Sequence, residues 1–215
     1  GSLSMDKRVR IVAYDDADGS LDGRHAAALR AKGEVLGFVH AGLEVKDPEW
    51  LREMVGHALR PEVGVVGASV QYPDDTLQYA GYILGPRMAP KSPFRRVPRD
   101  CMVYHGRTQL AQRFSAVSLT CALSRREVYE TAGGLSTEFC EELGDVDFCL
   151  RVGKSGFHVV WTPFAEVYLQ ASSAQGVKDL PGTRGRFLQN LKDLNARWAP
   201  DGFLDPFYNP NLSPH

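Results

Sequence analysis

Short apolar runs and turn signals alternate along most of the chain. The runs at 35–39 and 63–72 are nearly continuously apolar and of strand length, which is typical of central parallel strands buried on both faces. Further strands are expected at 9–14, 77–84, 115–123, 157–161 and 166–170, with Pro163 closing the strand at 157–161. The turn at 40–45 follows a buried strand, so it should border a ligand site.

Helical patterns separate these runs. A helix is expected from Asp22 to Lys32, with Gly33 as its stop, and another from an Asp47-Pro48 start. Ser124 to Glu127 has the spacing of a capping box, which predicts a helix that ends at the Gly133-Gly134 turn. A C-terminal amphipathic helix is marked by Phe187, Leu188, Leu191, Leu194 and Trp198. Strands that alternate with helices predict an α/β fold with a mostly parallel sheet.

Two polar segments break the pattern. Residues 15–20 carry three acids in a turn cluster, but the later ligands of a calcium loop are absent, which favours a solvated loop. Residues 85–114 have little periodicity, and a loop of that length is often functional. Its basic residues suit either an anionic ligand or a solvated loop, and the second interpretation is favoured: Arg87, Lys91, Arg95, Arg96 and Arg99.

Composition bounds the class of protein. The chain has 215 residues, 43% of them hydrophobic, with net charge −1 and pI near 6.7, which suits one globular domain. Residues 1–4 resemble a cloning scar, so the expected domain is 5–215. The near-neutral charge gives no general attraction to nucleic acid.

Cysteine usage and hydropathy indicate where the protein works. The four cysteines contain no C-x-x-C pair, and two have hydrophobic neighbours, as in buried thiols of a reducing compartment. No apolar run reaches the roughly 18 residues of a membrane span, and no signal peptide precedes the first strand. We therefore expect a cytoplasmic protein.

Two acids, Asp145 and Asp147, open a short helical run after the Gly133-Gly134 turn. Positions i and i+2 of a helix face nearly opposite ways, so the two carboxylates cannot share one role. If Asp145 faces a cleft, Asp147 faces its own helix, where Arg151 is a partner four residues later. Pattern alone favours the interpretation that both acids only decorate a helix N-terminus, where acids are common.

An ordered series of motifs resembles family 2 glycosyltransferases. The series comprises Asp47-Pro48-Glu49-Trp50-Leu51, Gly64-Val65-Val66-Gly67-Ala68, Tyr72-Pro73-Asp74, Gly133-Gly134-Leu135, Asp145-Val146-Asp147-Phe148-Cys149-Leu150-Arg151 and Trp161-Thr162-Pro163. The resemblance implies a Rossmann-like GT-A sheet and an inverting transfer from a nucleotide-sugar to a saccharide or lipid-linked acceptor, as in polysaccharide biosynthesis. By the same resemblance Asp145 is the catalytic base.

The family's metal site is degenerate here. The resemblance implies Mg²⁺ or Mn²⁺ held by an Asp-x-Asp turn and a later His. His40-Ala41-Gly42 stands at the first place and Leu169-Gln170 at the second. Gly42 has no side chain to donate, so we expect no metal cofactor.

The resemblance also suggests substrate-binding residues. Arg24 lies where the family faces the nucleotide, and it is either a phosphate contact or a solvated helix residue. His40 is a candidate acceptor-site residue. Asp147 and Arg151, beside the base, complete the candidate substrate-binding set.

A complete GT-A domain carries a nucleotide-binding strand-helix-strand unit before Val9, and we expect it to be lacking here. The bare sheet edge would favour a homo-oligomer or a neighbouring catalytic domain as partner. Two functions remain open: a glycosyltransferase domain, and a non-catalytic GT-A-like domain that binds glycan or acts as a scaffold. No G-x-G-x-x-G follows a strand, which disfavours a dehydrogenase.

Overall fold

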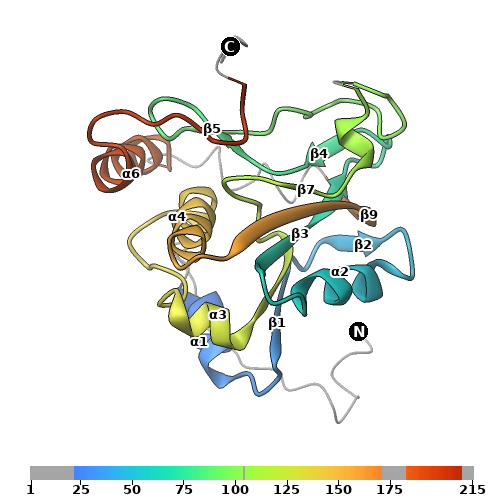
Figure 1. Ribbon diagram of the computed structural model, residues 1–215, viewed down its shortest axis with the longest axis horizontal. Helices are drawn as coiled ribbons and strands as arrows, with labels where there is room; N and C mark the ends of the chain where they lie inside the picture. Colours follow the sequence, from blue (N-terminus) through green and yellow to red (C-terminus); the bar gives the residue numbers. More distant parts are fainter. Residues whose placement is uncertain (1–21, 104, 171–182, 210–215) are drawn as a thin grey trace.

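The computed structural model describes residues 22–103, 105–170 and 183–209 (Figure 1). The helices are α1 (Asp22–Arg30), α2 (Trp50–Ala58), α3 (Arg126–Thr131), α4 (Glu141–Lys154) and α6 (Thr183–Trp198), with a 3-10 turn η2 (Arg107–Gln109). The strands are β1 (Val35–Val39), β2 (Leu43–Val45), β3 (Val63–Gln71), β4 (Leu77–Tyr79), β5 (Ile83–Leu84), β6 (Pro90–Lys91), β7 (Gln112–Arg113), β8 (Cys121–Arg125) and β9 (His158–Leu169). The strand expected at 9–14 and the acidic turn at 15–20 lie outside the described residues.

One mixed sheet forms the centre of the domain, in the order β1-β8-β3-β9-β2, with β4 beside β3 and β7 beside β9. The α/β class with a Rossmann-like sheet is confirmed, and the long strands β1, β3 and β9 share one direction. The expected parallel pairing needs a correction, because among the described strands only β3 and β9 pair in parallel. Among its described residues, the 72–120 segment after β3 contains no α-helical crossover, so β8 starts at the end where β3 stops and runs antiparallel.

The expectation that 35–39 is a central strand buried on both faces is wrong. β1 ends the strand order in the described part of the chain and pairs with β8 alone. Its side chains alternate, since Leu36 and Phe38 are buried whereas Val39 is 55% exposed. A short apolar run fits a half-buried strand as well as a fully buried one, so the pattern could not place it in the sheet.

Helices lie on both sides of the sheet (Figure 1), and an apolar layer of side chains packs on each face. On one face Met54 and Ala58 of α2 pack with Val66 and Val160. On the other face the side chains of α4 pack with Val65, as do residues of α1, α3 and α6. Neighbouring residues of β3 therefore serve opposite layers, as the pleat of a strand requires. This arrangement fixes α4, which carries Asp145 and Asp147, against the sheet.

Pro163 does not end the last strand, as the sequence suggested, because β9 continues through it. Gly67 pairs with Trp161 and Ser69 with Glu166, so residues 162–165 stand opposite Ala68 alone. Proline lacks an N–H and is tolerated in such a bulge, where no ladder hydrogen bond is required. One long strand thus replaces the two that were expected.

The prediction of a capping box at Ser124 is also wrong. Ser124 lies in β8, and its hydroxyl donates to the carbonyl of Gly64 at 2.8 Å. The residue before α3 is Arg125, which makes no side-chain cap. Pairing of β8 with β3 satisfies the serine more fully than a helix start would, so tertiary structure overrides the local motif.

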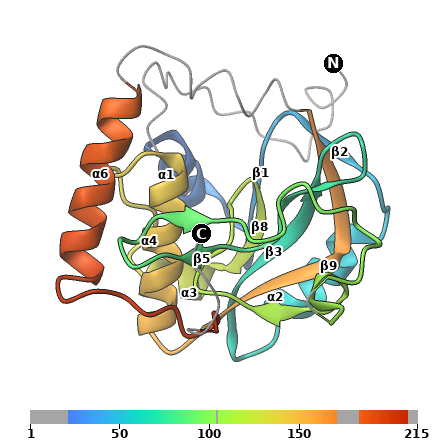
Figure 2. The same ribbon diagram turned by 90° about the horizontal axis from the view of Figure 1, so that it is seen from above.

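The C-terminal part covers α4. Figure 2 shows α6 on the outer side of α4, away from the sheet. Leu194 of α6 is fully buried in the layer that contains α4. The segment after α6 returns toward β5, where the Asp205 carboxylate accepts a hydrogen bond from the Leu84 N–H at 2.7 Å. No helix in the described ranges combines the length and apolar character needed to cross a membrane.

Gly64→Ala tests the approach of α4 to β3. A Cβ at position 64 would lie 2.4 Å from Val152 Cγ1 and 2.7 Å from Phe157 Cβ. We expect a loss of about 1–3 kcal/mol, which lowers Tm by about 3–10 °C in thermal unfolding. The control Gly153→Ala, in α4 with nothing within 4 Å of its added Cβ, should leave Tm unchanged or raise it. Equal Tm values for the two variants would contradict this packing.

Candidate active site

The carboxyl ends of β1, β3 and β9 lie at one edge of the sheet, because these strands share a direction. His40 directly follows β1, and its N–H donates to the carbonyl of Thr120, just before β8, at 2.8 Å. Tyr72 follows β3 at the same edge. Ligands of open α/β sheets bind at such an edge, so the site is built from here.

Asp145 reaches this edge from α4. Its Oδ2 accepts a hydrogen bond from the backbone N–H of Leu119 at 2.9 Å, and its Oδ1 lies 3.4 Å from Arg24 Nη1. The residue is only 4% exposed. The sequence suggested that Asp145 opens the helix. The helix instead begins at Glu141, so Asp145 lies a full turn inside it. The carboxylate is therefore held in position by the Leu119 N–H, from the segment just before β8, and by Arg24 of α1.

Asp147 faces the other way, as its helical spacing predicts, and it is fully buried. It accepts hydrogen bonds from Arg151 Nε and Trp198 Nε1, both at 2.9 Å, and lies 3.4 Å from Arg197 Nη1. The expected pair with Arg151 is present. Because the carboxylate is buried and has partners on two helices, it is a much stronger link than an exposed i,i+4 pair.

The Arg151 side chain makes its hydrogen bonds within the protein. Besides its bond to Asp147, its Nη1 donates to the carbonyl of Ala132, at the end of α3. It thus joins α4 to the C-terminus of α3, where a positive charge also favours the helix dipole. The sequence analysis places Asp147 and Arg151 in the substrate-binding set. In the structure they lie on the side of α4 that contacts α3 and α6.

Arg24 and Asp145 are brought together, although 121 residues separate them. The Arg24 side chain is 30% exposed. Its second terminal nitrogen, Nη2, is buried and has no hydrogen-bond partner among the described residues. A buried donor without a partner is costly, which makes this guanidinium the candidate contact for an anionic ligand.

His40 is exposed at the end of β1, and its Nδ1 accepts a hydrogen bond from the Gly42 N–H at 3.0 Å. This bond closes the turn that replaces the family's Asp-x-Asp turn. The turn is poorly suited to a divalent metal, because Gly42 has no side-chain ligand and the Nδ1 lone pair of His40 is engaged. Within the described ranges, no group of three or more His, Cys, Asp or Glu residues is arranged to hold a metal ion.

The sequence analysis did not identify three further residues at this edge, Tyr79, Tyr82 and Glu142. Burial, and next the negative charge of Glu142, raise the pKa of Tyr79 to about 12. Burial raises the pKa of Tyr82 well above its usual value, with contributions from Glu142, Tyr79 and Asp145. Glu142 stands three residues before Asp145, on the same helix face, so helical spacing was the signal that could have found it. The tyrosines come from the β4–β5 segment, and no local pattern connects them to α4.

The basic segment of the long loop is anchored at this edge, which corrects the interpretation as a solvated loop. Arg95 Nε donates to the Tyr72 hydroxyl at 3.0 Å. The Arg96 guanidinium lies 3.7 Å from the centre of the Tyr72 ring and 3.1 Å from Asp74. Arg99 Nε donates to Glu166 at 3.1 Å. These contacts hold positive charge near the strand ends.

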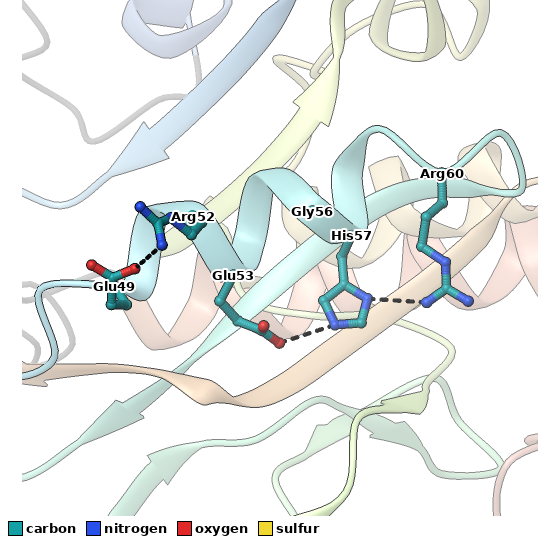
Figure 3. Close-up of a pocket in the computed structure, with 6 residues that line it drawn as sticks. All are labelled: Glu49, Arg52, Glu53, Gly56, His57 and Arg60. Carbon is teal, nitrogen blue, oxygen red and sulfur yellow. Dashed lines mark hydrogen bonds and ion pairs between the residues drawn. The ribbon is translucent and has the colours of Figure 1, made fainter.

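A separate hollow lies along α2 (Figure 3). Its charges are paired along the helix, for example His57 Nε2 with Glu53 Oε1 at 3.1 Å. Glu53 also accepts a hydrogen bond from Thr162 Oγ1 at 2.7 Å. Because α2 covers the opposite face of the sheet from α4, this hollow is not part of the Asp145 site. Its lining residues are Glu49, Arg52, Glu53, Gly56, His57 and Arg60.

Two solved structures share the fold over most of the chain. A structure of GalNAc-T7 with UDP, GalNAc and Mn²⁺ has a TM-score of 0.66 over 88% of this chain and 37% of its own, at 16% identity. The mannosyltransferase PcManGT from Pyrobaculum calidifontis, in complex with GDP-Man and Mn²⁺, has a TM-score of 0.53 over 88% of this chain and 46% of its own, at 18% identity. The domain therefore has the GT-A glycosyltransferase fold.

The family is established by sequence. The model of Glycosyl transferase family 2 matches residues 2–131, more than half of the chain. The protein thus belongs to glycosyl transferase family 2, as the motifs predict, and is an enzyme domain by resemblance.

Two curated relatives are much longer than this chain. The uncharacterized protein y4gI of Sinorhizobium fredii is 37% identical over 209 residues, which are 97% of this chain and 23% of the relative. The O-antigen biosynthesis protein RfbC of Myxococcus xanthus is 34% identical over 188 residues, which are 87% of this chain and 14% of the relative. The chain spans less than a quarter of either relative.

Asp147→Asn tests the buried carboxylate. Loss of the charge leaves Arg151 without its counter-ion and Arg197 with Glu138 alone, which should cost about 3 kcal/mol and lower Tm by roughly 6–12 °C in thermal unfolding. The control Asp193→Asn changes an exposed residue of α6 that contacts Gln189, and it should shift Tm by no more than about 2 °C. A Tm of Asp147→Asn equal to that of the control would show that the network contributes little.

Proposed function

We propose that this chain is a glycosyltransferase domain of a polysaccharide-building protein. It transfers a sugar from a nucleotide-sugar donor to a saccharide or lipid-linked acceptor, with inversion at the anomeric carbon. The observation that carries the proposal is Asp145, a buried carboxylate fixed at the strand ends by the Leu119 N–H. The name of the Myxococcus relative supports a role in polysaccharide biosynthesis, and the titles of the solved structures support nucleotide-sugar donors.

In this reaction Asp145 is the general base. As the acceptor hydroxyl oxygen bonds to the anomeric carbon, its proton passes to the Asp145 carboxylate. The bond from the anomeric carbon to the diphosphate breaks, and its electron pair leaves with the diphosphate. The Leu119 N–H donates to Asp145 Oδ2 and keeps the side chain in place.

Arg24 has two parts in this proposal. Its Nη1 lies 3.4 Å from Asp145 Oδ1 and helps to orient the base. Its Nη2, which has no hydrogen-bond partner in the described part of the chain, would bind a phosphate oxygen of the donor. His40, at the end of β1, would contact the acceptor or donor sugar through Nε2.

A second candidate is a non-catalytic GT-A-like domain that binds glycan or acts as a scaffold for a neighbouring catalytic domain. The turn at His40 and Gly42 favours it, because it offers no ligand for the metal that usually neutralises a diphosphate leaving group. The share of the relatives that the chain covers, 23% and 14%, is consistent with such neighbours.

Location and assembly remain expectations. The four cysteines are free, two of them buried, which supports a reducing compartment such as the cytoplasm. Within the described residues β1 has a partner on one side only, which supports association of this edge with another chain or domain.

Asp145→Asn distinguishes the two candidates. In an assay of nucleoside diphosphate release with acceptor glycan, on the full-length protein, we expect a 10²–10⁴-fold loss of kcat. Asp193→Asn, the exposed control on α6, should retain full activity. Glycan binding without transfer in the wild-type protein would favour the scaffold function. Transfer that survives Asp145→Asn in a folded variant would contradict the role of this residue as the base.

A further inference from the structure

A lysine ammonium occupies a cage of oxygen atoms beside the candidate site. Lys46 Nζ lies 2.6 Å from Asp75 Oδ1, 3.1 Å from Gln71 Oε1 and 3.1 Å from Glu166 Oε2. It also lies 5.1 Å from the centre of the Tyr168 ring. An ammonium has three protons, so these three oxygens satisfy all of them.

The cage is assembled from distant parts of the chain. Gln71 ends β3 and is fully buried, Asp75 belongs to the turn after β3, and Glu166 lies in β9. Lys46 directly follows β2. The cation therefore joins three strands that the sheet places side by side at its carboxyl-end edge.

The oxygen atoms are themselves held in position. Gln71 Nε2 donates to Glu166 Oε2 at 3.1 Å. Arg99 Nε donates to Glu166 Oε1, and the Tyr168 hydroxyl donates to Asp75 Oδ1 at 2.6 Å. Such support orients oxygen ligands in metal sites, and two carboxylates with an amide oxygen are a donor set that hard divalent cations accept.

The lysine stays charged at all physiological pH values. Partial burial lowers the pKa of Lys46, but hydrogen bonds to Asp75, Tyr168 and Glu166 outweigh this effect and raise the pKa above its usual value. The contact with Lys46, followed by that with Tyr168, lowers the pKa of Asp75. The cage thus holds an ammonium beside the ionised carboxylate of Asp75.

We propose that Lys46 is a built-in cation, which permanently fills an oxygen cage suited to a divalent metal and joins β2, β3 and β9 in its place. This cage is separate from the turn at His40 and Gly42. The protein thereby keeps the shape of its strand-end edge without depending on the metal concentration. The inference concerns metal binding and stability, so it does not depend on the proposed transfer reaction.

Lys46→Met opens the cage while keeping an apolar stem of similar length. In EDTA we expect this variant to have a Tm about 3–6 °C below the wild-type value, because two carboxylates lose their shared cation. Addition of MnCl₂ should raise the Tm of the variant saturably, and electron paramagnetic resonance should show one Mn²⁺ bound per chain. The wild-type Tm should be the same in EDTA and in MnCl₂.

Two further variants make the result specific. Lys32→Met, at an exposed lysine after α1, should show neither the fall in Tm nor Mn²⁺ binding. Adding Glu166→Gln to Lys46→Met should abolish the Mn²⁺ response, because a cage ligand is lost. If Lys46→Met is unfolded in EDTA, recovery of the fold by Mn²⁺ supports the proposal. Saturable Mn²⁺ binding by the wild-type chain, or failure of Mn²⁺ to affect Lys46→Met, would overturn it.

Discussion

The position of α4, and with it that of Asp145, depends on the hydrogen bonds and ion pairs of the buried Asp147 carboxylate. A charge removed from water is tolerated only when donors surround it, and Arg151, Trp198 and Arg197 supply them. These donors lie on two helices, so α6 must pack on α4 for the charge to be satisfied. The same packing fixes the rotation of α4 about its axis, which turns Asp145 toward the strand ends.

At the strand ends, charge is balanced by side chains of the chain itself. Arg24 neutralises Asp145, and Lys46 joins Asp75 and Glu166. GT-A proteins with Mn²⁺ in their solved structures share this fold, while Gly42 offers no side-chain ligand for such an ion. The side-chain ammonium and guanidinium groups cannot dissociate from the protein as a metal ion can. They therefore hold the strand-end edge in its shape before a ligand binds.

Much of the fold could be predicted from the sequence because it depends on periodicity. The strand at 35–39, the helix after Asp47 and the C-terminal helix all appear where their patterns place them. The opposite orientations of Asp145 and Asp147 follow from helix geometry alone. The partners of Asp145 could not be predicted in this way, since Arg24 and Leu119 are brought to it by sheet order and helix packing.

By itself the sequence predicted several of the strands and helices, the family to which the chain belongs, and the absence of a side-chain metal ligand at Gly42. Only the tertiary structure decided that β8 runs antiparallel between β1 and β3, that β9 passes through Pro163, and that Lys46 meets Asp75 and Glu166. The reason is physical. Local patterns record which face of an element is apolar, whereas strand order and ion pairing depend on contacts between residues far apart in the chain.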